Sequence, residues 1–341
     1  MNVLWIMADQ LRWDYLSCYG AKHIDTPNID HLAARGVLFN RAYVQSPICG
    51  PSRMSFYTGR YVRSHGATWN GFPLRVGEPT LGDHLREIGV TSSLVGKTHM
   101  RPDEDGMKRL GIDPESTIGA LVSQCGFEEY IRDDGTNAAT DKNRHAEDYE
   151  RYLREHGMDG ETPWEEWANT SIGPDGEKKS GWFLENAPLP ARVPKEYSET
   201  AWLTTRGIEF MEEQGNDPWL CHLSYIKPHW PYMAPAPYND MYSKDDLPPV
   251  NRRTGEHTHP LMQAWEKTRI CESFSREDVR ELVAPVYMGL IKELDDNMGR
   301  LFEYLETSGR IKDTMVVFCS DHGDNMGDHW LGEKDLFYDC S

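Results

Sequence analysis

Four short apolar segments of the sequence are each followed at once by polar residues that could bind a metal ion or an anion. In chain order, these polar sequences are Asp9-Gln10, Gly96-Lys97-Thr98-His99, Lys227-Pro228-His229 and Asp321-His322-Gly323-Asp324. Ligands of an open α/β sheet bind beyond the carboxyl ends of its strands. If the four segments form adjacent parallel strands, these side chains therefore meet at one edge of the sheet and form a polar site.

The candidate ligands for a divalent cation are the carboxylates of Asp9 and Asp321, the imidazole of His322 and the amide oxygen of Gln10. Carboxylate and amide oxygens suit calcium or magnesium, whereas an imidazole shifts the preference towards manganese or zinc. A single aspartate after a strand is more simply explained as a helix N-cap. The coincidence of four polar strand ends favours a site over that simpler interpretation.

A second chemical feature is the sequence CGPSRMSFYTGR, which begins at Cys49. Pro51 is a residue that the first turn of a helix tolerates, so we expect a helix to start just after Cys49. The thiol would then lie at a helix N-terminus, where free N–H groups favour negative charge. Arg53, one turn further on, can direct its guanidinium back towards an anion or the nucleophile. The alternative interpretation is that Cys49 is only a buried thiol.

The elements that must position these residues follow from the alternation of short apolar runs with helical patterns, which predicts a doubly wound α/β sheet. We expect strands at residues 3–7, 92–95, 219–225 and 314–320, and helices at 28–35, 51–57, 80–88, 199–213 and 277–305. Thr80 can cap its helix, with Asp83 at the capping-box position. Residues 126–197 are rich in Gly, Asp, Glu, Asn and Pro, and we expect a lid or insertion over one edge of the sheet.

Composition narrows the class of protein. A chain of 341 residues can bury a sizeable core, which suggests one α/β domain with elaborations. The formal net charge of −19 argues against general nucleic-acid binding, so an anionic substrate must be attracted by local cations or a metal. Seven cysteines without regular spacing do not suggest a disulfide framework. The sequence opens on a short apolar run without a basic leader, so we expect a cytoplasmic protein with no membrane partner.

The order of Cys49, Pro51 and Arg53 resembles the signature of the sulfatase family, which belongs to the alkaline phosphatase superfamily. Further segments follow the order seen in this family: Ala8-Asp9-Gln10, Thr26-Pro27-Asn28-Ile29-Asp30, Gly96-Lys97-Thr98-His99, Lys227-Pro228-His229-Trp230-Pro231-Tyr232 and Ser320-Asp321-His322-Gly323. The resemblance implies an alkaline-phosphatase-like α/β fold over residues 1–341, with a mixed, largely parallel sheet flanked by helices and long loops. The family usually adds a smaller C-terminal subdomain, which the residues up to Ser341 do not include.

The resemblance also implies two cofactors. The cysteine of the family is oxidised to formylglycine by a formylglycine-generating enzyme, which would act on Cys49. One divalent metal ion, calcium or manganese, would be held by five residues: Asp9, Gln10, Cys49, Asp321 and His322. Many sulfatases carry a second aspartate where this chain has Gln10, and the amide lowers the negative charge of the site.

The activity that the resemblance implies is hydrolysis of sulfate monoesters of a small molecule. The hydrated formylglycine, activated by the metal and Arg53, would attack the sulfur, while Lys97 and Lys334 would neutralise charge on its oxygens. His229 or His99 would protonate the leaving alcohol. The alternative for Lys334 is a solvated surface lysine.

Asn70 is a further candidate for substrate binding, although the Asn-Gly pair that it forms with Gly71 is more simply explained as a turn.

Two alternative functions remain open. The chain is similar to the branch of the family that hydrolyses phosphonate monoesters and phosphodiesters, through segments 192–197, 236–238 and 260–262. The pair of Lys97 and His99 is instead the sulfatase form, so we prefer a sulfatase. The second alternative is a non-catalytic metal- or anion-binding relative in which Cys49 stays a thiol. Relatives often associate, so a homo-oligomer is possible.

Overall fold

The computed structural model describes residues 1–341 except 137–146, 253–254 and 256–258. Its central sheet contains β1 (Asn2–Asp9), β2 (Thr91–Gly96), β3 (Glu128–Arg132), β6 (Trp219–Pro228) and β7 (Thr314–Ser320), in the order β3-β2-β6-β1-β7. Every pair of neighbours in this sheet is parallel. The four strands predicted from the sequence are therefore adjacent and parallel, which confirms the α/β fold class.

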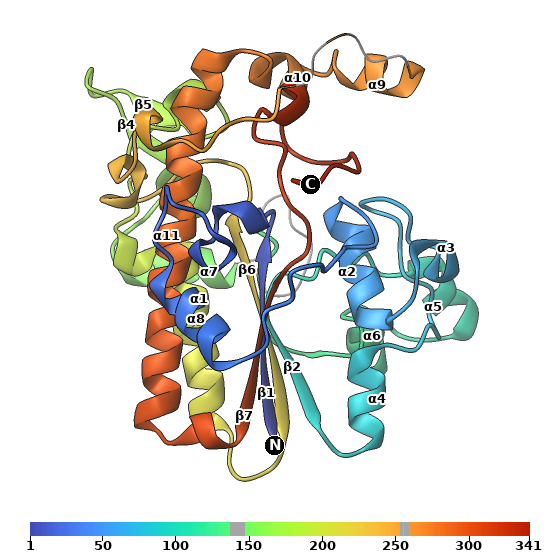
Figure 1. Ribbon diagram of the computed structural model, residues 1–341. Helices are drawn as coiled ribbons and strands as arrows, with labels where there is room; N and C mark the ends of the chain where they lie inside the picture. The colour runs from blue at the N-terminus through green and yellow to red at the C-terminus, as the bar shows by residue number, and fades with distance from the viewer. Residues whose placement is uncertain (137–146, 253–254, 256–258) are drawn as a thin grey trace.

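Helices cover both faces of the sheet (Figure 1). The helices of the described residues are α1 (Pro27–Arg35), α2 (Cys49–Thr58), α3 (Val62–His65), α4 (Leu81–Glu87), α5 (Glu104–Leu110), α6 (Thr117–Val122), α7 (Asp148–Glu155), α8 (Glu199–Glu213), α9 (Pro260–Trp265), α10 (Arg269–Phe274) and α11 (Glu277–Thr307), of which α9 and α10 lie beyond the carboxyl ends of the strands in Figure 1. Figure 1 shows α1, α8 and α11 on one side of the sheet and α2 to α6 on the other. Within the described residues, none of these helices is both long and apolar enough to cross a membrane.

The helix predictions agree with the structure to within a few residues. The backbone N–H of Thr80 donates to the carboxylate of Asp83 (3.0 Å), as the capping prediction requires. Helix α2 begins at Cys49 itself, whereas the sequence analysis placed its start just after this residue. This difference corrects the expected position by one residue, because the chain is already helical at the thiol.

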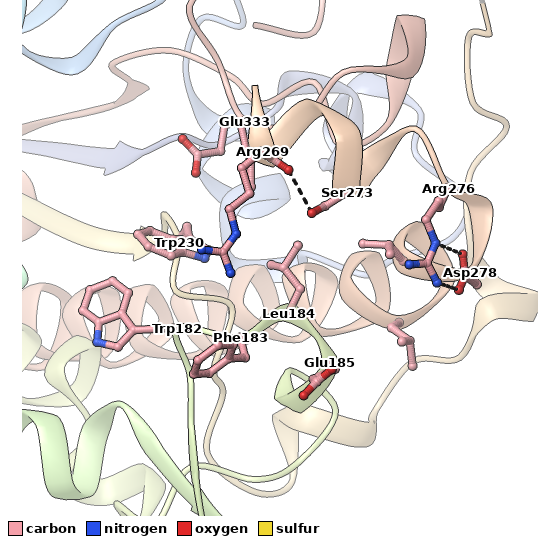
Figure 2. A pocket seen from close by; sticks show the side chains of 13 residues that line it. Trp182, Phe183, Leu184, Glu185, Trp230, Arg269, Ser273, Arg276, Asp278 and Glu333 are labelled. Carbon is pink, nitrogen blue, oxygen red and sulfur yellow. Dashed lines mark hydrogen bonds and ion pairs between the residues drawn. The ribbon is translucent and has the colours of Figure 1, made fainter. Parts of the chain in front are cut away.

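The segment 126–197 is only partly the elaboration that the sequence analysis expected. Its beginning forms β3, which pairs with β2 as an edge strand of the main sheet. The sequence of β3 is Glu-Glu-Tyr-Ile-Arg, and its charges hide the apolar signal of a strand because an edge strand is only partly buried. The later part holds α7 and a separate hairpin of β4 (Thr170–Ile172) and β5 (Lys178–Ser180). Residues 182–185 and helix α10 then border a cavity (Figure 2).

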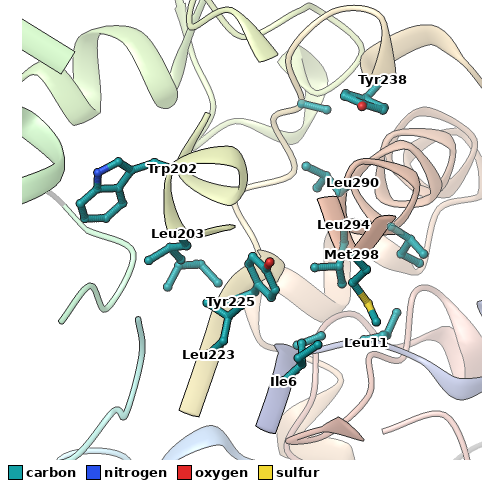
Figure 3. Close-up of a cluster of buried hydrophobic side chains, with 14 of the residues drawn as sticks. Ile6, Leu11, Trp202, Leu203, Leu223, Tyr225, Tyr238, Leu290, Leu294 and Met298 are labelled. Atoms are coloured by element: carbon teal, nitrogen blue, oxygen red, sulfur yellow. The ribbon is translucent and has the colours of Figure 1, made fainter. Parts of the chain in front are cut away.

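The core has two parts because successive strand residues point to opposite faces of the sheet. Ile6 of β1 and Leu223 of β6 pack in the larger part, against α8 and α11. Figure 3 shows these two residues gathered with Tyr225, Leu203 of α8 and Leu294 of α11. Trp5 and Met7 of β1 and Leu220 of β6 belong to the smaller part, together with Met54 and Tyr57 of α2. The sheet is thus fixed from both faces, and its carboxyl edge can hold polar groups in defined positions.

Candidate active site

The carboxyl ends of β1 and β7 place two aspartates side by side. Ala8 of β1 pairs with Ser320 of β7. Asp9 and Asp321 are the next residues along the chain, so they lie at the same level of the sheet. Gln10 adopts a left-handed backbone (φ 65°), and its N–H donates to Asp321 Oδ1 (3.1 Å). A non-glycine residue in this region is uncommon and is often found at functional sites.

Helix α2 brings Cys49 to the same edge. The side chain of Cys49 is fully buried, and Ser52, one turn later, donates from Oγ to the carbonyl of Asp321 (2.5 Å). Asn70 Oδ1 accepts from the backbone N–H of Gly50 (2.8 Å), which satisfies a free donor at the start of the helix. A Cβ at residue 50 would lie 2.9 Å from Asn70 Oδ1, so this close approach favours glycine.

Four side chains at this edge could hold one metal ion: Asp9, Cys49, Asp321 and His322. One ligand atom from each lies within 4.8 Å of the others, and all four residues are buried. His322 Nε2 lies 3.1 Å from Cys49 Sγ and 3.6 Å from Oδ1 of each aspartate. Two carboxylate oxygens, an imidazole nitrogen and residue 49 form a donor set that suits a divalent cation. The residues therefore fit the predicted metal.

Gln10 was also predicted as a metal ligand, but its amide makes other contacts here. Gln10 Oε1 accepts from Lys334 Nζ (2.8 Å), and Gln10 Nε2 donates to Asp324 Oδ2 (2.5 Å). Tyr232 donates to the same Asp324 oxygen (2.6 Å). The sequence analysis gave Tyr232 no role and did not name Asp324 among the candidate ligands, although both lie inside the segments that follow strands. Their signal was their position in those segments, not their residue type.

Arg53 binds both aspartates through the oxygens that do not face the metal ligands. Arg53 Nε donates to Asp321 Oδ2 (2.7 Å) and Arg53 Nη2 to Asp9 Oδ2 (3.2 Å). Its Nη1 donates to Ser224 Oγ (2.7 Å) and to the carbonyl of Lys97 (2.8 Å). Arg53 was expected to direct its guanidinium towards an anion or the nucleophile, and in the structure its partners include the carboxylates of Asp9 and Asp321. Its part in activating the nucleophile stays a prediction.

Lys97 also contacts a metal-ligand candidate. Its ammonium lies 2.6 Å from Asp9 Oδ2, and both side chains are buried. Burial raises the pKa of Asp9, but the charges of Lys97, His229 and Arg53 outweigh this effect and hold that pKa well below its usual range. Asp9 is therefore ionised in the folded protein.

Lys334 lies close to both Cys49 and His229. Lys334 Nζ lies 3.1 Å from Cys49 Sγ and 2.7 Å from His229 Nε2. Burial raises the pKa of the Cys49 thiol, but the positive charges of Lys334, His322 and Lys97 reverse this and leave it well below its usual range. This pocket of cations stabilises negative charge at residue 49, as an anionic substrate requires.

Two predicted site residues lie further from the thiol. The backbone N–H of His99 donates to Asp134 Oδ1 (3.0 Å), and no hydrogen bond of the described residues joins its imidazole to Cys49. Asn70 contacts the site through its side-chain oxygen, which accepts a hydrogen bond from the backbone N–H of Gly50 at the start of α2. The roles of His99 as a catalyst and of Asn70 as a substrate contact stay predictions.

Comparison with known proteins defines the class. The sequence pattern of the sulfatase family matches residues 1–337, so the chain belongs to the sulfatase family. It is 31% identical to the multifunctional alkaline phosphatase superfamily protein PehA of Trinickia caryophylli, over 97% of this chain and 64% of that protein. It is 26% identical to an arylsulfatase of Clostridium perfringens, over 100% of this chain and 66% of that protein.

A solved structure with the same fold is the phosphonate monoester hydrolase of Agrobacterium radiobacter, with a TM-score of 0.81 and 28% identity. The match covers 100% of this chain and 66% of that one. The chain therefore spans a little less than two thirds of the length of these relatives. The alkaline-phosphatase-like fold and the family predicted from the sequence are confirmed.

Proposed function

We propose that the protein hydrolyses sulfate monoesters of small molecules, with formylglycine made from Cys49 as the nucleophile. The observation that carries this proposal is the position of Cys49. It lies at the start of α2, with Sγ 3.7 Å from Asp9 Oδ1 and 3.1 Å from both His322 Nε2 and Lys334 Nζ. Membership of the sulfatase family supports the same conclusion. Cys49 would be matured by a formylglycine-generating enzyme.

Asp9, Asp321, His322 and residue 49 would hold one divalent cation, calcium or manganese. When bound, the metal would supply positive charge that polarises the ester and favours ionised oxygen at residue 49. The hydrated aldehyde would offer one hydroxyl for attack and a second whose deprotonation releases the product. The imidazole of His322 makes manganese as good a candidate as calcium.

The remaining residues bind and orient the substrate. Lys334, 3.1 Å from Cys49 Sγ, would bind a non-bridging oxygen of the transferred group and neutralise its charge. His229, 2.7 Å from Lys334, would hold the proton that the leaving alcohol needs. Arg53 is a positioning residue in this proposal, because it donates to Asp9 and Asp321, and among the described residues no hydrogen bond joins it to Cys49.

A second candidate activity is hydrolysis of phosphonate monoesters or phosphodiesters. The similarity to the Agrobacterium hydrolase favours it. Sulfate and phosphonate groups are both tetrahedral and anionic, so one pocket of cations can bind either.

The test compares three substrates that share one leaving group: para-nitrophenyl sulfate, para-nitrophenyl phenylphosphonate and bis-para-nitrophenyl phosphate. Protein produced with a formylglycine-generating enzyme is assayed for kcat/KM on each, beside Cys49→Ala as the control. Because the leaving group is constant, the ratios report only the transferred group. The primary proposal expects the highest kcat/KM for the sulfate and loss of all turnover in Cys49→Ala.

A higher kcat/KM for the phosphonate would make the second candidate the function. Equal turnover in Cys49→Ala and the parent protein would contradict both candidates.

A further inference from the structure

The side-chain amide of Gln10 lies between a buried carboxylate and the cation next to residue 49. Gln10 Nε2 donates to Asp324 Oδ2 (2.5 Å), and Gln10 Oε1 accepts from Lys334 Nζ (2.8 Å). All three side chains are buried, and Lys334 Nζ lies 3.1 Å from Cys49 Sγ. A chain of contacts therefore joins Asp324 to the position of the nucleophile, and no reaction step described above uses Asp324.

The chemistry of its two neighbours decides which way this amide points. A lysine ammonium has three N–H donors and no acceptor, so the atom of Gln10 that faces Lys334 must be the oxygen. The amide nitrogen therefore faces Asp324, whose carboxylate oxygens accept hydrogen bonds. Tyr232 donates to the same oxygen of Asp324 (2.6 Å). The positions of oxygen and nitrogen in the amide are thus fixed from both sides.

The second carboxylate oxygen of Asp324 is also held. The backbone N–H of Met326 donates to Asp324 Oδ1 (2.7 Å). An asparagine at residue 324 would keep its oxygen at this N–H and would place its NH2 group where Oδ2 now lies. This NH2 group would donate to Gln10, which can accept only if its amide turns over. The nitrogen of Gln10 would then face the ammonium of Lys334, and neither group can accept from the other.

The backbone of Gln10 leaves little room to relieve this conflict. Its N–H donates to Asp321 Oδ1 (3.1 Å), and its carbonyl accepts from the hydroxyl of Tyr287 in α11 (2.7 Å). Movement therefore falls to the side chain of Lys334, which would lose one acceptor and turn away from the position that it holds beside Cys49.

We propose that Asp324 is a positioning residue of the site, which acts through Gln10 to hold the ammonium of Lys334 beside residue 49. The catalytic consequence rests on the proposed function, because Lys334 is the residue that neutralises charge on the transferred group there. Asp324 itself serves only to fix the direction of the amide.

The test is a double-mutant cycle of Asp324→Asn with Lys334→Met, which keeps the length of the lysine without its charge. Two quantities are measured: kcat/KM for the para-nitrophenyl ester that the parent hydrolyses best, and the affinity for inorganic sulfate by calorimetry. Asp324→Asn alone should lower both at least about tenfold, the worth of a hydrogen bond to a charged group. Combined with Lys334→Met, the same substitution should change either quantity by less than about twofold.

Asp328→Asn is the matched control. Asp328 is a buried carboxylate of the same loop, and it accepts from Arg12 Nη2 (2.9 Å) and from the backbone N–H of Asn251 (2.8 Å). It should keep kcat/KM and sulfate affinity within about twofold of the parent. An effect of Asp324→Asn no larger than that of the control, or equal with and without Lys334, would overturn the proposal and leave the proposed function intact.

If the parent protein hydrolyses none of the three para-nitrophenyl esters, the proposed function fails, and sulfate binding then tests Asp324 separately. The cycle is read on sulfate affinity alone, in the parent, the two single variants and the double variant. A tenfold loss in Asp324→Asn that disappears in the Lys334→Met background would support the positioning role. Absence of sulfate binding to the parent, or equal losses in both backgrounds, would overturn it.

Discussion

At the scale of single residues, the two strand-end aspartates divide their oxygens between two tasks. The Oδ2 atoms of Asp9 and Asp321 face Arg53, at 3.2 Å and 2.7 Å. The Oδ1 atoms of both face His322 Nε2, each at 3.6 Å. Arg53 therefore fixes the orientation of both carboxylates and also offsets the cost of burying them.

Replacing Arg53 by lysine tests this arrangement. A lysine keeps the positive charge but cannot donate to both carboxylates from one planar group. Loss of a residue that orients metal ligands typically lowers metal affinity or activity by about 10- to 100-fold. We expect Arg53→Lys to weaken manganese binding by this factor, measured by calorimetry on protein stripped of metal.

The matched control is Arg63→Lys, an exposed arginine in α3. It should bind manganese as the parent does. Unchanged manganese affinity in Arg53→Lys would show that the contacts with Asp9 and Asp321 serve stability alone.

At the scale of elements, the turn after β6 carries His229, and a buried cluster of charged side chains lies next to this turn. Lys227 Nζ donates to the carbonyl of Pro231 (2.8 Å) and to that of His229 (3.3 Å). Glu199 at the start of α8 and Glu293 of α11 line the same small cavity as Lys227. The two long helices that pack on the sheet thus also brace the loop that holds the candidate proton donor.

Glu293 makes this brace sensitive to pH. Burial raises the pKa of Glu293 to about 7, although the hydrogen bond from Ser198 and the charge of Lys227 favour the anion; Glu199 and Asp296 add repulsion. Because the folded pKa lies above the ordinary value, its stabilising contribution is complete below about pH 4.5 and is lost as the pH rises through about 7. The full effect is at most about 3 kcal/mol.

We therefore expect Glu293→Gln to flatten the pH dependence of stability. Between about pH 5 and pH 8, the free energy of unfolding should fall less in the variant than in the parent, because glutamine cannot ionise. Urea unfolding at each pH measures this difference. Glu303→Gln, at an exposed position of the same helix, should keep the slope of the parent. Identical slopes in all three proteins would show that ionisation of Glu293 does not contribute to the pH dependence of stability.

At the scale of the whole molecule, the sequence was enough to predict four adjacent strands of the five-stranded sheet and the meeting of their ends. Short apolar runs that alternate with helical patterns limit the topology, and parallel strands bring their polar ends to one edge. Asp9, Cys49 and Asp321 meet although Asp9 and Asp321 are separated by most of the chain. Strand pairing decides this contact, so a sequence pattern can reveal it.

Other features have no local signal. The direction of Arg53 depends on which buried carboxylates surround it, and its guanidinium pairs with both Asp9 and Asp321. The cavity beside Trp230 joins loops and helices distant in the sequence, and no spacing of residues announces it. Strand β3 was missed because its charged edge residues break the apolar alternation.

The metal should stabilise the molecule as a whole, since its candidate ligands come from the ends of β1 and β7 and from α2. A ligand present at 100 times its dissociation constant adds about 2.7 kcal/mol to folding. We expect a chelator to lower the midpoint of thermal unfolding by several degrees, and manganese to restore it. Asp321→Asn should show a smaller response to the chelator than the parent does. An equal midpoint with and without chelator would argue against metal binding at this edge.

The central claim is that residue 49 is a modified cysteine at a metal-binding edge of the sheet, and mass spectrometry of the peptide that contains it is the most direct test. In catalytically active protein, conversion of the cysteine to formylglycine should lower the mass of this peptide by about eighteen daltons. An active preparation in which Cys49 is entirely an unmodified thiol would contradict the account.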